Sequence, residues 1–90
     1  MDNRPPAPKI SFPCEYSLRV ICTNTPTIQR DVLTLIEPFI SPVNPGAVRV
    51  KHSKKSRFIS VYIPIFATGE TQLSRIHRAL TEDERVKMVI

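Results

Sequence analysis

The chain has 90 residues and a formal net charge of +5, with 41% hydrophobic and 23% charged residues. This length supports one domain, and no apolar run approaches the roughly 18 residues that a membrane span needs. The first nine residues also lack the apolar stretch of a secretory signal, so we expect a cytoplasmic protein with no membrane partner.

The N-terminal segment carries Pro5, Pro6 and Pro8 in a polar setting without a core-forming pattern. Such a composition favours an extended, poorly ordered tail. We therefore predict a disordered tail over residues 1–11 and a single folded domain over residues 12–90.

The first predicted strand begins at Glu15 and alternates apolar and polar residues up to Cys22. Its wetter face carries Glu15, Ser17 and Arg19, and its buried face carries Tyr16, Leu18, Val20 and Cys22. Cys14 and Cys22 would lie about 26 Å apart in an extended strand, whereas a disulfide needs α-carbons within about 7 Å. We expect two free thiols, which suit a reducing compartment.

The first helix is predicted to follow Asn24 or Thr25, because either side chain can cap it and Pro26 suits its first position. Pro38 restricts its continuation, which gives a helix of about 15 residues, roughly 22 Å long. Residues 41–46 predict a loop. The apolar stripe of this helix is Ile28, Val32, Leu35, Ile36 and Phe39.

Two strands are predicted after this loop, joined by a turn at residues 53–56. Val48 and Val50 alternate with cations in the short second strand. The third strand presents one apolar face, made of Ile59, Val61, Ile63 and Ile65, and a second face made of Phe58, Ser60, Tyr62, Pro64 and Phe66. Because proline cannot donate to a ladder, we expect that a neighbouring strand has ended at Pro64 or that a bulge intervenes there.

The last third of the chain predicts a helix and a final strand. Thr68 is the expected cap of the helix, whose apolar stripe is Leu73, Ile76 and Leu80. The final strand is predicted from an alternation that would bury Val86, Met88 and Ile90. The order β-α-β-β-α-β predicts an α+β, ferredoxin-like sandwich, in which both helices cover one face of a four-stranded antiparallel sheet and the first and third strands are central.

Several segments resemble the YbeD-like family of small bacterial proteins: Phe12–Val20, Ser60–Thr68, Gln72–Ile76, Leu80 and Val86–Ile90. The similarity covers residues 12–90, and the Val-x-Met-Val-aliphatic ending is its most specific part. The resemblance implies a cytoplasmic protein, often encoded beside lipoate-metabolism genes, with a fold similar to ACT regulatory domains. Those domains bind small effectors or partner subunits and carry out no chemistry. The family has no established functional residue, so none is transferred.

The sheet face away from the helices is the first candidate binding surface. Its expected rings and cations are Phe58, Tyr62, Phe66, Arg49 and Lys51. RNA-recognition modules combine rings and cations in this way, but residues 57–62 lack the glycine of their motif and have Ser60 where an aromatic is wanted. A second copy of the domain, the N-terminal tail or a protein partner are the other ways to cover such a face.

The basic hairpin is the second candidate, with Arg49, Lys51, Lys54, Lys55 and Arg57 within nine residues. In one interpretation these cations bind a phosphate-bearing or acidic partner. In the other, they prevent an exposed edge strand from pairing with another chain. His52 alternates in phase with Val50, which predicts an imidazole at the edge of the core.

No combination of residues predicts catalysis, a metal site or a cofactor. Neither Cys14 nor Cys22 has a basic neighbour in sequence that would activate a thiolate. Three adjacent acids at residues 82–84 point in different directions, as in a solvated loop. We expect a non-enzymatic regulatory or adaptor module that binds a small effector or a protein partner, with a homodimer as one form of it. Binding of single-stranded RNA is the alternative.

Overall fold

The computed structural model describes residues 12–90, and the predicted tail over residues 1–11 lies outside them. Two 3₁₀ turns, Glu37–Phe39 and Pro45–Ala47, connect the first helix to the second strand. No helix in the described part of the chain has the length and apolar character needed to cross a bilayer. The main elements are β1 (Cys14–Thr23), α1 (Ile28–Ile36), β2 (Arg49–His52), β3 (Phe58–Ala67), α2 (Glu70–Thr81) and β4 (Val86–Val89).

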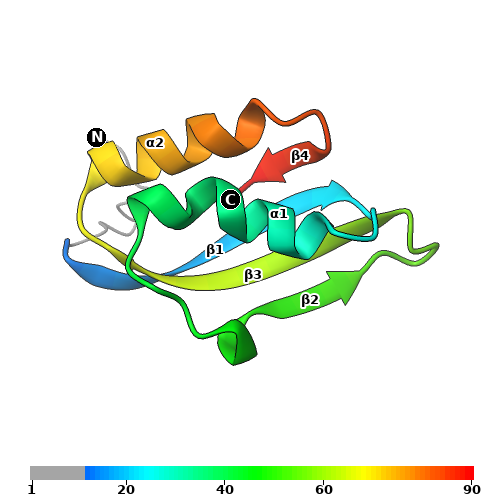
Figure 1. Ribbon diagram of the computed structural model, residues 1–90, viewed down its shortest axis with the longest axis horizontal. Helices are drawn as coiled ribbons and strands as arrows, with labels where there is room; N and C mark the ends of the chain where they lie inside the picture. The colour runs from blue at the N-terminus through cyan, green and yellow to red at the C-terminus, as the bar shows by residue number, and fades with distance from the viewer. Residues whose placement is uncertain (1–11) are drawn as a thin grey trace, which may run out of the picture.

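The strands form one antiparallel sheet in the order β2-β3-β1-β4, with both helices on one side of it (Figure 1). This arrangement confirms the predicted ferredoxin-like α+β sandwich with β1 and β3 at its centre. These two strands pair from Cys14 opposite Ala67 to Thr23 opposite Phe58. The sheet face away from the helices is called the open face below.

The core lies between the sheet and the two helices. Strict alternation sends one phase of each central strand toward the helices, and the helical stripes complete the layer. Burying each of these side chains stabilises the fold by roughly 1.5–3 kcal/mol. The large aliphatic residues that are fully buried are Val20, Val32, Ile36, Val61, Ile63, Ile76 and Leu80.

Pro64 lies where its missing N–H has no cost. Arg49 opposite Tyr62 is the last pair between β2 and β3, so β2 ends before the proline is reached. Ile63 faces Leu18 on the β1 side, and the alternation of the ladder turns the nitrogen of Pro64 toward the vacated β2 side. The prediction that a neighbouring strand has ended there is confirmed.

The first helix begins later and is shorter than predicted. Asn24 does not cap it, because the Asn24 side chain donates to the carbonyl of Ser56 at 2.8 Å and its N–H donates to the carbonyl of Arg57 at 3.0 Å. These bonds hold Asn24 against the β2–β3 hairpin, and α1 starts at Ile28 with nine residues. The 3₁₀ turn that contains Pro38 ends its regular geometry, as proline favours.

Thr68 does not cap the second helix, and its backbone is instead bound by Gln72 of that helix. The Gln72 side chain accepts from the N–H of Thr68 at 2.8 Å, and Gly69 occupies the N-cap position. The same side chain donates to the carbonyls of Phe39 at 2.8 Å and Phe66 at 3.3 Å. One amide therefore ties α2 to the end of β3 and to the turn after α1.

A β-bulge changes the phase of β4. Val86 lies opposite Cys22, but Met88 lies opposite Ile21 and Val89 opposite Val20, so Lys87 is the extra residue. Val86 and Val89 pack against the core, whereas Met88 is 53% exposed and Ile90 is 51% exposed. The predicted burial of Met88 and Ile90 is wrong, because the alternation of the sequence does not reveal the bulge.

Candidate functional site

A row of four side chains crosses the middle of the open face. The register places Arg49 of β2 beside Tyr62 of β3, and Tyr62 beside Arg19 of β1. Arg19 exchanges two backbone hydrogen bonds with Ile90, at 3.0 and 2.8 Å. Residues directly opposite in an antiparallel sheet project to the same face. The row, called the central row below, therefore places a guanidinium on each side of one ring.

Arg19 is the most constrained side chain of the central row. Its guanidinium carbon lies 5.5 Å from the centroid of the Tyr62 ring, which is a cation–π distance. The Arg19 Nε atom is buried and has no hydrogen-bond partner among the described residues. An unpaired buried donor costs about 1–3 kcal/mol. Because this atom is closed to solvent, a carboxylate on the open face meets the positive charge of the half-buried Arg19 side chain and does not bond to Nε.

The next row repeats the same distribution of charge and apolar surface. Lys51 of β2 lies beside Ser60, Ser60 beside Ile21, and Ile21 beside Met88 of β4. In both rows the cation stands at the β2 edge and an exposed aliphatic side chain stands at the β4 edge. The open face is therefore cationic along one edge and apolar along the other.

The predicted site residues fall into three separate places. Arg49, Lys51 and Tyr62 line one shallow hollow of about 360 Å³. Phe58, 37% exposed, lies at the hairpin end, and Phe66, 50% exposed, lies opposite Glu15 at the far end. Four residues of extended strand separate each phenylalanine from Tyr62, a distance of about 13 Å. The three rings do not form one continuous stacking surface.

The remaining hairpin cations lie beyond the sheet. Lys54, Lys55 and Arg57 are exposed in and after the turn, away from the central row. Ser56 takes a φ of 54°, which sets the tight return into β3. His52 is also exposed, so its predicted place at the edge of the core is wrong: it ends a short edge strand beside the turn.

Four contributors to the open face were not predicted as site residues: Arg19, Ile21, Met88 and Ile90. The alternation of β1 already places Arg19 on its wetter face, and the central position of β1 puts that residue in the middle of the sheet. The alternation and the central position of β1 together could have identified Arg19 as a residue of the open face. The sequence gives no such signal for Met88 and Ile90, because only the bulge brings them to this face.

The thiols offer no exposed nucleophile. Cys22 is fully buried, and burial raises the pKa of its thiol. Cys14 is half-buried, and both cysteines are free. Within residues 12–90, no group of three or more His, Cys, Asp or Glu side chains could hold a metal ion.

Arg85 organises an ionic cluster away from the open face. It donates to Asp83 at 3.1 and 2.9 Å and to Asp31 at 2.8 Å. These hydrogen bonds lower the pKa of both carboxyl groups. The predicted solvated character of residues 82–84 is wrong for Asp83. The cluster links α1 to the loop before β4, and its groups satisfy one another, which is typical of a structural role.

A family model described as "Protein of unknown function (DUF493)" matches residues 7–90. The chain belongs to the DUF493 family. A UPF0250 protein of Azotobacter vinelandii is 38% identical to this member over 85 residues, which cover 93% of this chain and 92% of the relative. This match also confirms the resemblance to the YbeD-like bacterial proteins.

Two solved structures show the fold of this DUF493 chain. Protein HP0495 from H. pylori is similar with a TM-score of 0.73 and 23% identity, covering 100% of this chain and 94% of that one. The ACT domain from GTP pyrophosphokinase of Chlorobium tepidum has a TM-score of 0.62 and 12% identity, covering 84% of each chain. The fold is therefore ACT-like, and at these identities the likeness shows the fold alone.

Proposed function

We propose that this DUF493 chain is a non-enzymatic adaptor module whose open face binds an acidic partner protein. The central row carries the proposal. Arg19 and Arg49 flank Tyr62, and Arg19 pairs with Ile90, whose side chain is exposed, so a carboxylate and an apolar side chain of a partner can be bound side by side on this face. Burial of Cys22 supports the absence of nucleophilic chemistry.

A second copy of the chain fits this face less well than a different, acidic partner. A face-to-face dimer with its two-fold axis across the strands would bring the cations of one β2 edge against those of the other, and an axis along the strands would place them over the apolar β4 edge, where no carboxylate among residues 12–90 pairs with them. Arg19, Arg49 and Lys51 stand on this face, with Glu15 as its acidic residue at the far end. Like charges across an interface are unfavourable, whereas an acidic surface complements them.

Single-stranded RNA also fits less well. Bases stack on exposed ring faces placed within reach of consecutive nucleotides. The guanidinium of Arg19 already lies over Tyr62, and the two phenylalanines are each about 13 Å away along the strand.

The test compares two charge-reversal variants against a defined probe. The probe is a fluorescent peptide of about ten residues that alternates Glu with Leu, read by anisotropy at about 0.15 M salt. Arg49→Glu with Lys51→Glu should weaken binding by about tenfold or more. Arg75→Glu with Arg78→Glu changes the net charge equally on the exposed side of α2 and should change affinity by about twofold or less.

The same anisotropy measurement is repeated with a fluorescent oligouridine of about eight nucleotides to test RNA binding. We expect it to bind more weakly than the acidic peptide at this salt concentration. Equal losses of affinity for the acidic peptide in the two charge-reversal variants would show attraction by net charge alone. Tighter binding of the oligouridine than of the peptide would show that RNA is the partner. Either result would overturn the proposal.

A further inference from the structure

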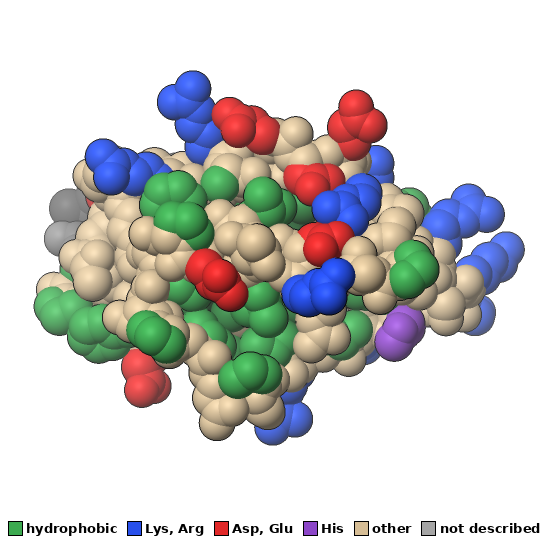
Figure 2. Space-filling view, in the orientation of Figure 1, with side chains coloured by type: hydrophobic (Ala, Val, Ile, Leu, Met, Phe, Trp, Pro, Cys, Tyr) green, Lys and Arg blue, Asp and Glu red, His purple; other side chains and the backbone are tan. Residues whose placement is uncertain are grey.

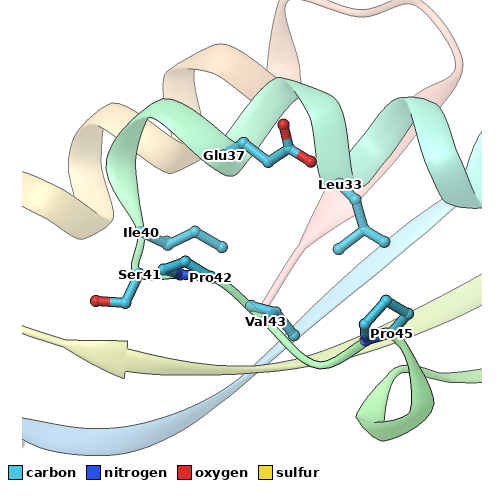
Figure 3. A pocket seen from close by; sticks show the side chains of 7 residues that line it. All are labelled: Leu33, Glu37, Ile40, Ser41, Pro42, Val43 and Pro45. Carbon is cyan, nitrogen blue, oxygen red and sulfur yellow. The ribbon is translucent and has the colours of Figure 1, made fainter.

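A separate groove lies on the helix side of the molecule, between α1 and the segment Ile40–Pro45. Figure 2 shows hydrophobic side chains gathered there, with acidic and basic side chains along the helix border. The first part of the groove has a volume of about 330 Å³. As Figure 3 shows, the side chains of Leu33, Ile40, Val43 and Pro45 converge on it.

The groove continues along the helix. An adjoining hollow of about 470 Å³ shares Leu33 and Pro45 with the first and extends to Pro26 and Arg30. Together the two hollows have the size range and the mainly apolar lining of sites that hold small molecules.

Opposite charges stand at the two ends of this groove. Arg30 and Leu33 of α1 and Glu37 at its C-terminal cap follow one stripe, at spacings of three and four residues. Glu37 lines the first hollow and Arg30 lines the second. The rise over seven helical residues puts the backbones of Arg30 and Glu37 about 10 Å apart along the helix axis, with Leu33 between them. A ligand that fills the groove therefore meets a carboxylate at one end, an apolar floor, and a guanidinium at the other end.

The wall opposite the helix has extended backbone angles at Ile40 and Asn44 and, between them, main-chain groups without a partner among the described residues. Ile40 has φ −131° and ψ 159°, and Asn44 has φ −66° and ψ 117°. The main-chain groups of Ser41 and Val43 make no hydrogen bond with other described residues. Extended backbone of this kind pairs with another extended chain.

The same wall is held in place before any ligand arrives. Pro42 and Pro45 fix their own φ angles, and the side chain of Asn44 accepts from the N–H of Gly46 at 3.0 Å. A wall that is already ordered lowers the entropy cost of binding.

We propose that this groove binds a short zwitterionic peptide of about three residues. Its amine pairs with Glu37, its carboxylate pairs with Arg30, and an apolar side chain packs on Leu33. Three extended residues span about 10 Å, which matches the separation of the Arg30 and Glu37 backbones along the helix, and the amine and carboxylate of such a peptide lie farther apart than those of a single α-amino acid. The site is independent of the open face and goes beyond the adaptor function.

The test is an NMR titration of the full chain with the tripeptide Ala-Leu-Ala, up to about 10 mM. The amides of Leu33, Ile40 and Val43 should shift. Arg30→Gln and Glu37→Gln should each weaken binding by about five- to tenfold. The controls Glu70→Gln and Arg75→Gln, both exposed on α2, should leave binding unchanged, as should the open-face variant Arg49→Glu with Lys51→Glu.

Two further probes distinguish binding of a zwitterionic peptide from non-specific binding. The same tripeptide with an acetylated amine and an amidated carboxylate should bind about tenfold or more weakly, and free leucine should also bind more weakly. Equal binding of the capped peptide or of leucine would overturn the proposal. The absence of shifts at about 10 mM tripeptide, or shifts confined to the open face, would overturn it as well.

Discussion

Arg85 shows how single residues act in this fold without belonging to a binding surface. Its guanidinium joins Asp31 at the first turn of α1 to Asp83 in the loop before β4. Thr27 adds a hydrogen bond to Asp31 at 2.7 Å. Because these bonds favour the ionised carboxyl groups, the pKa of each aspartate is lower in the folded chain than the ordinary 3.8.

The pH dependence of stability follows from that direction. A lowered folded pKa contributes stability that is present above the unfolded value of 3.8 and is lost as the pH falls through the folded value. Arg85→Gln should therefore lower the free energy of unfolding at pH 7 and have a smaller effect in strong acid. Carboxyl NMR titration of Asp31 and Asp83 should show both pKa values rising in this variant. An unchanged pKa for both aspartates would contradict the role given to Arg85.

At the scale of elements, patterns repeated over many residues could be predicted from the sequence, and features set by one contact could not. The alternation in β3 fixed its buried face because Ile59, Val61, Ile63 and Ile65 all obey it. The helix starts were misplaced because Asn24 binds the β2–β3 hairpin and because Gly69, not Thr68, occupies the N-cap position of α2. The bulge at Lys87 depends on the pairing of β4 with β1, which is a tertiary contact. This bulge determines which side chains of β4 lie on the open face.

The bulge predicts which side chains of β4 contribute to stability. Val89→Ala removes methyl groups packed against the core and should lower the free energy of unfolding by about 1–2 kcal/mol. Met88→Ala acts on an exposed side chain and should cost less than about 0.5 kcal/mol. Denaturant unfolding of the two variants measures the difference. If Met88→Ala proved the more costly, β4 would follow the unbroken alternation instead.

The hydrogen bonds of Gln72 lead to a second prediction about stability. Replacing it with Ala leaves the N–H of Thr68 and the carbonyl of Phe39 without their side-chain partner. We expect a loss of about 1–3 kcal/mol in the free energy of unfolding. Gln29→Ala, on the exposed side of α1, is the matched control and should cost less than about 0.5 kcal/mol. Equal effects of the two substitutions would remove Gln72 as the link between α2 and β3.

For the whole molecule, the uneven placement of charge matters more than the net value of +5. Cations follow the β2 edge of the open face, aliphatic side chains follow the β4 edge, and the helix side carries its own charged groove. The sequence indicated the rings and hairpin cations of the open face. It could not indicate the central row as a unit, because that row joins residues 19, 49, 62 and 90 through strand pairing alone.

This charge distribution predicts the oligomeric state of the isolated chain. Repulsion between two open faces should keep it monomeric, near 10.2 kDa, in sedimentation at about 0.2 mM protein and 0.15 M salt. A dimer at this concentration that is lost in the variant Arg49→Glu with Lys51→Glu would show that the open face binds a second copy. That result would contradict the argument for a different, acidic partner.

The most direct test of the central claim is an NMR titration of the full chain with the alternating Glu–Leu peptide. We expect the largest shifts on the central row, at Arg19, Arg49, Tyr62 and Ile90, and no shifts on α2. Charge reversal at Arg49 and Lys51 should strongly reduce these shifts at the same peptide concentration. Shifts centred on the helices, or a central row that does not respond to the peptide, would contradict the claim that the open face is the binding surface.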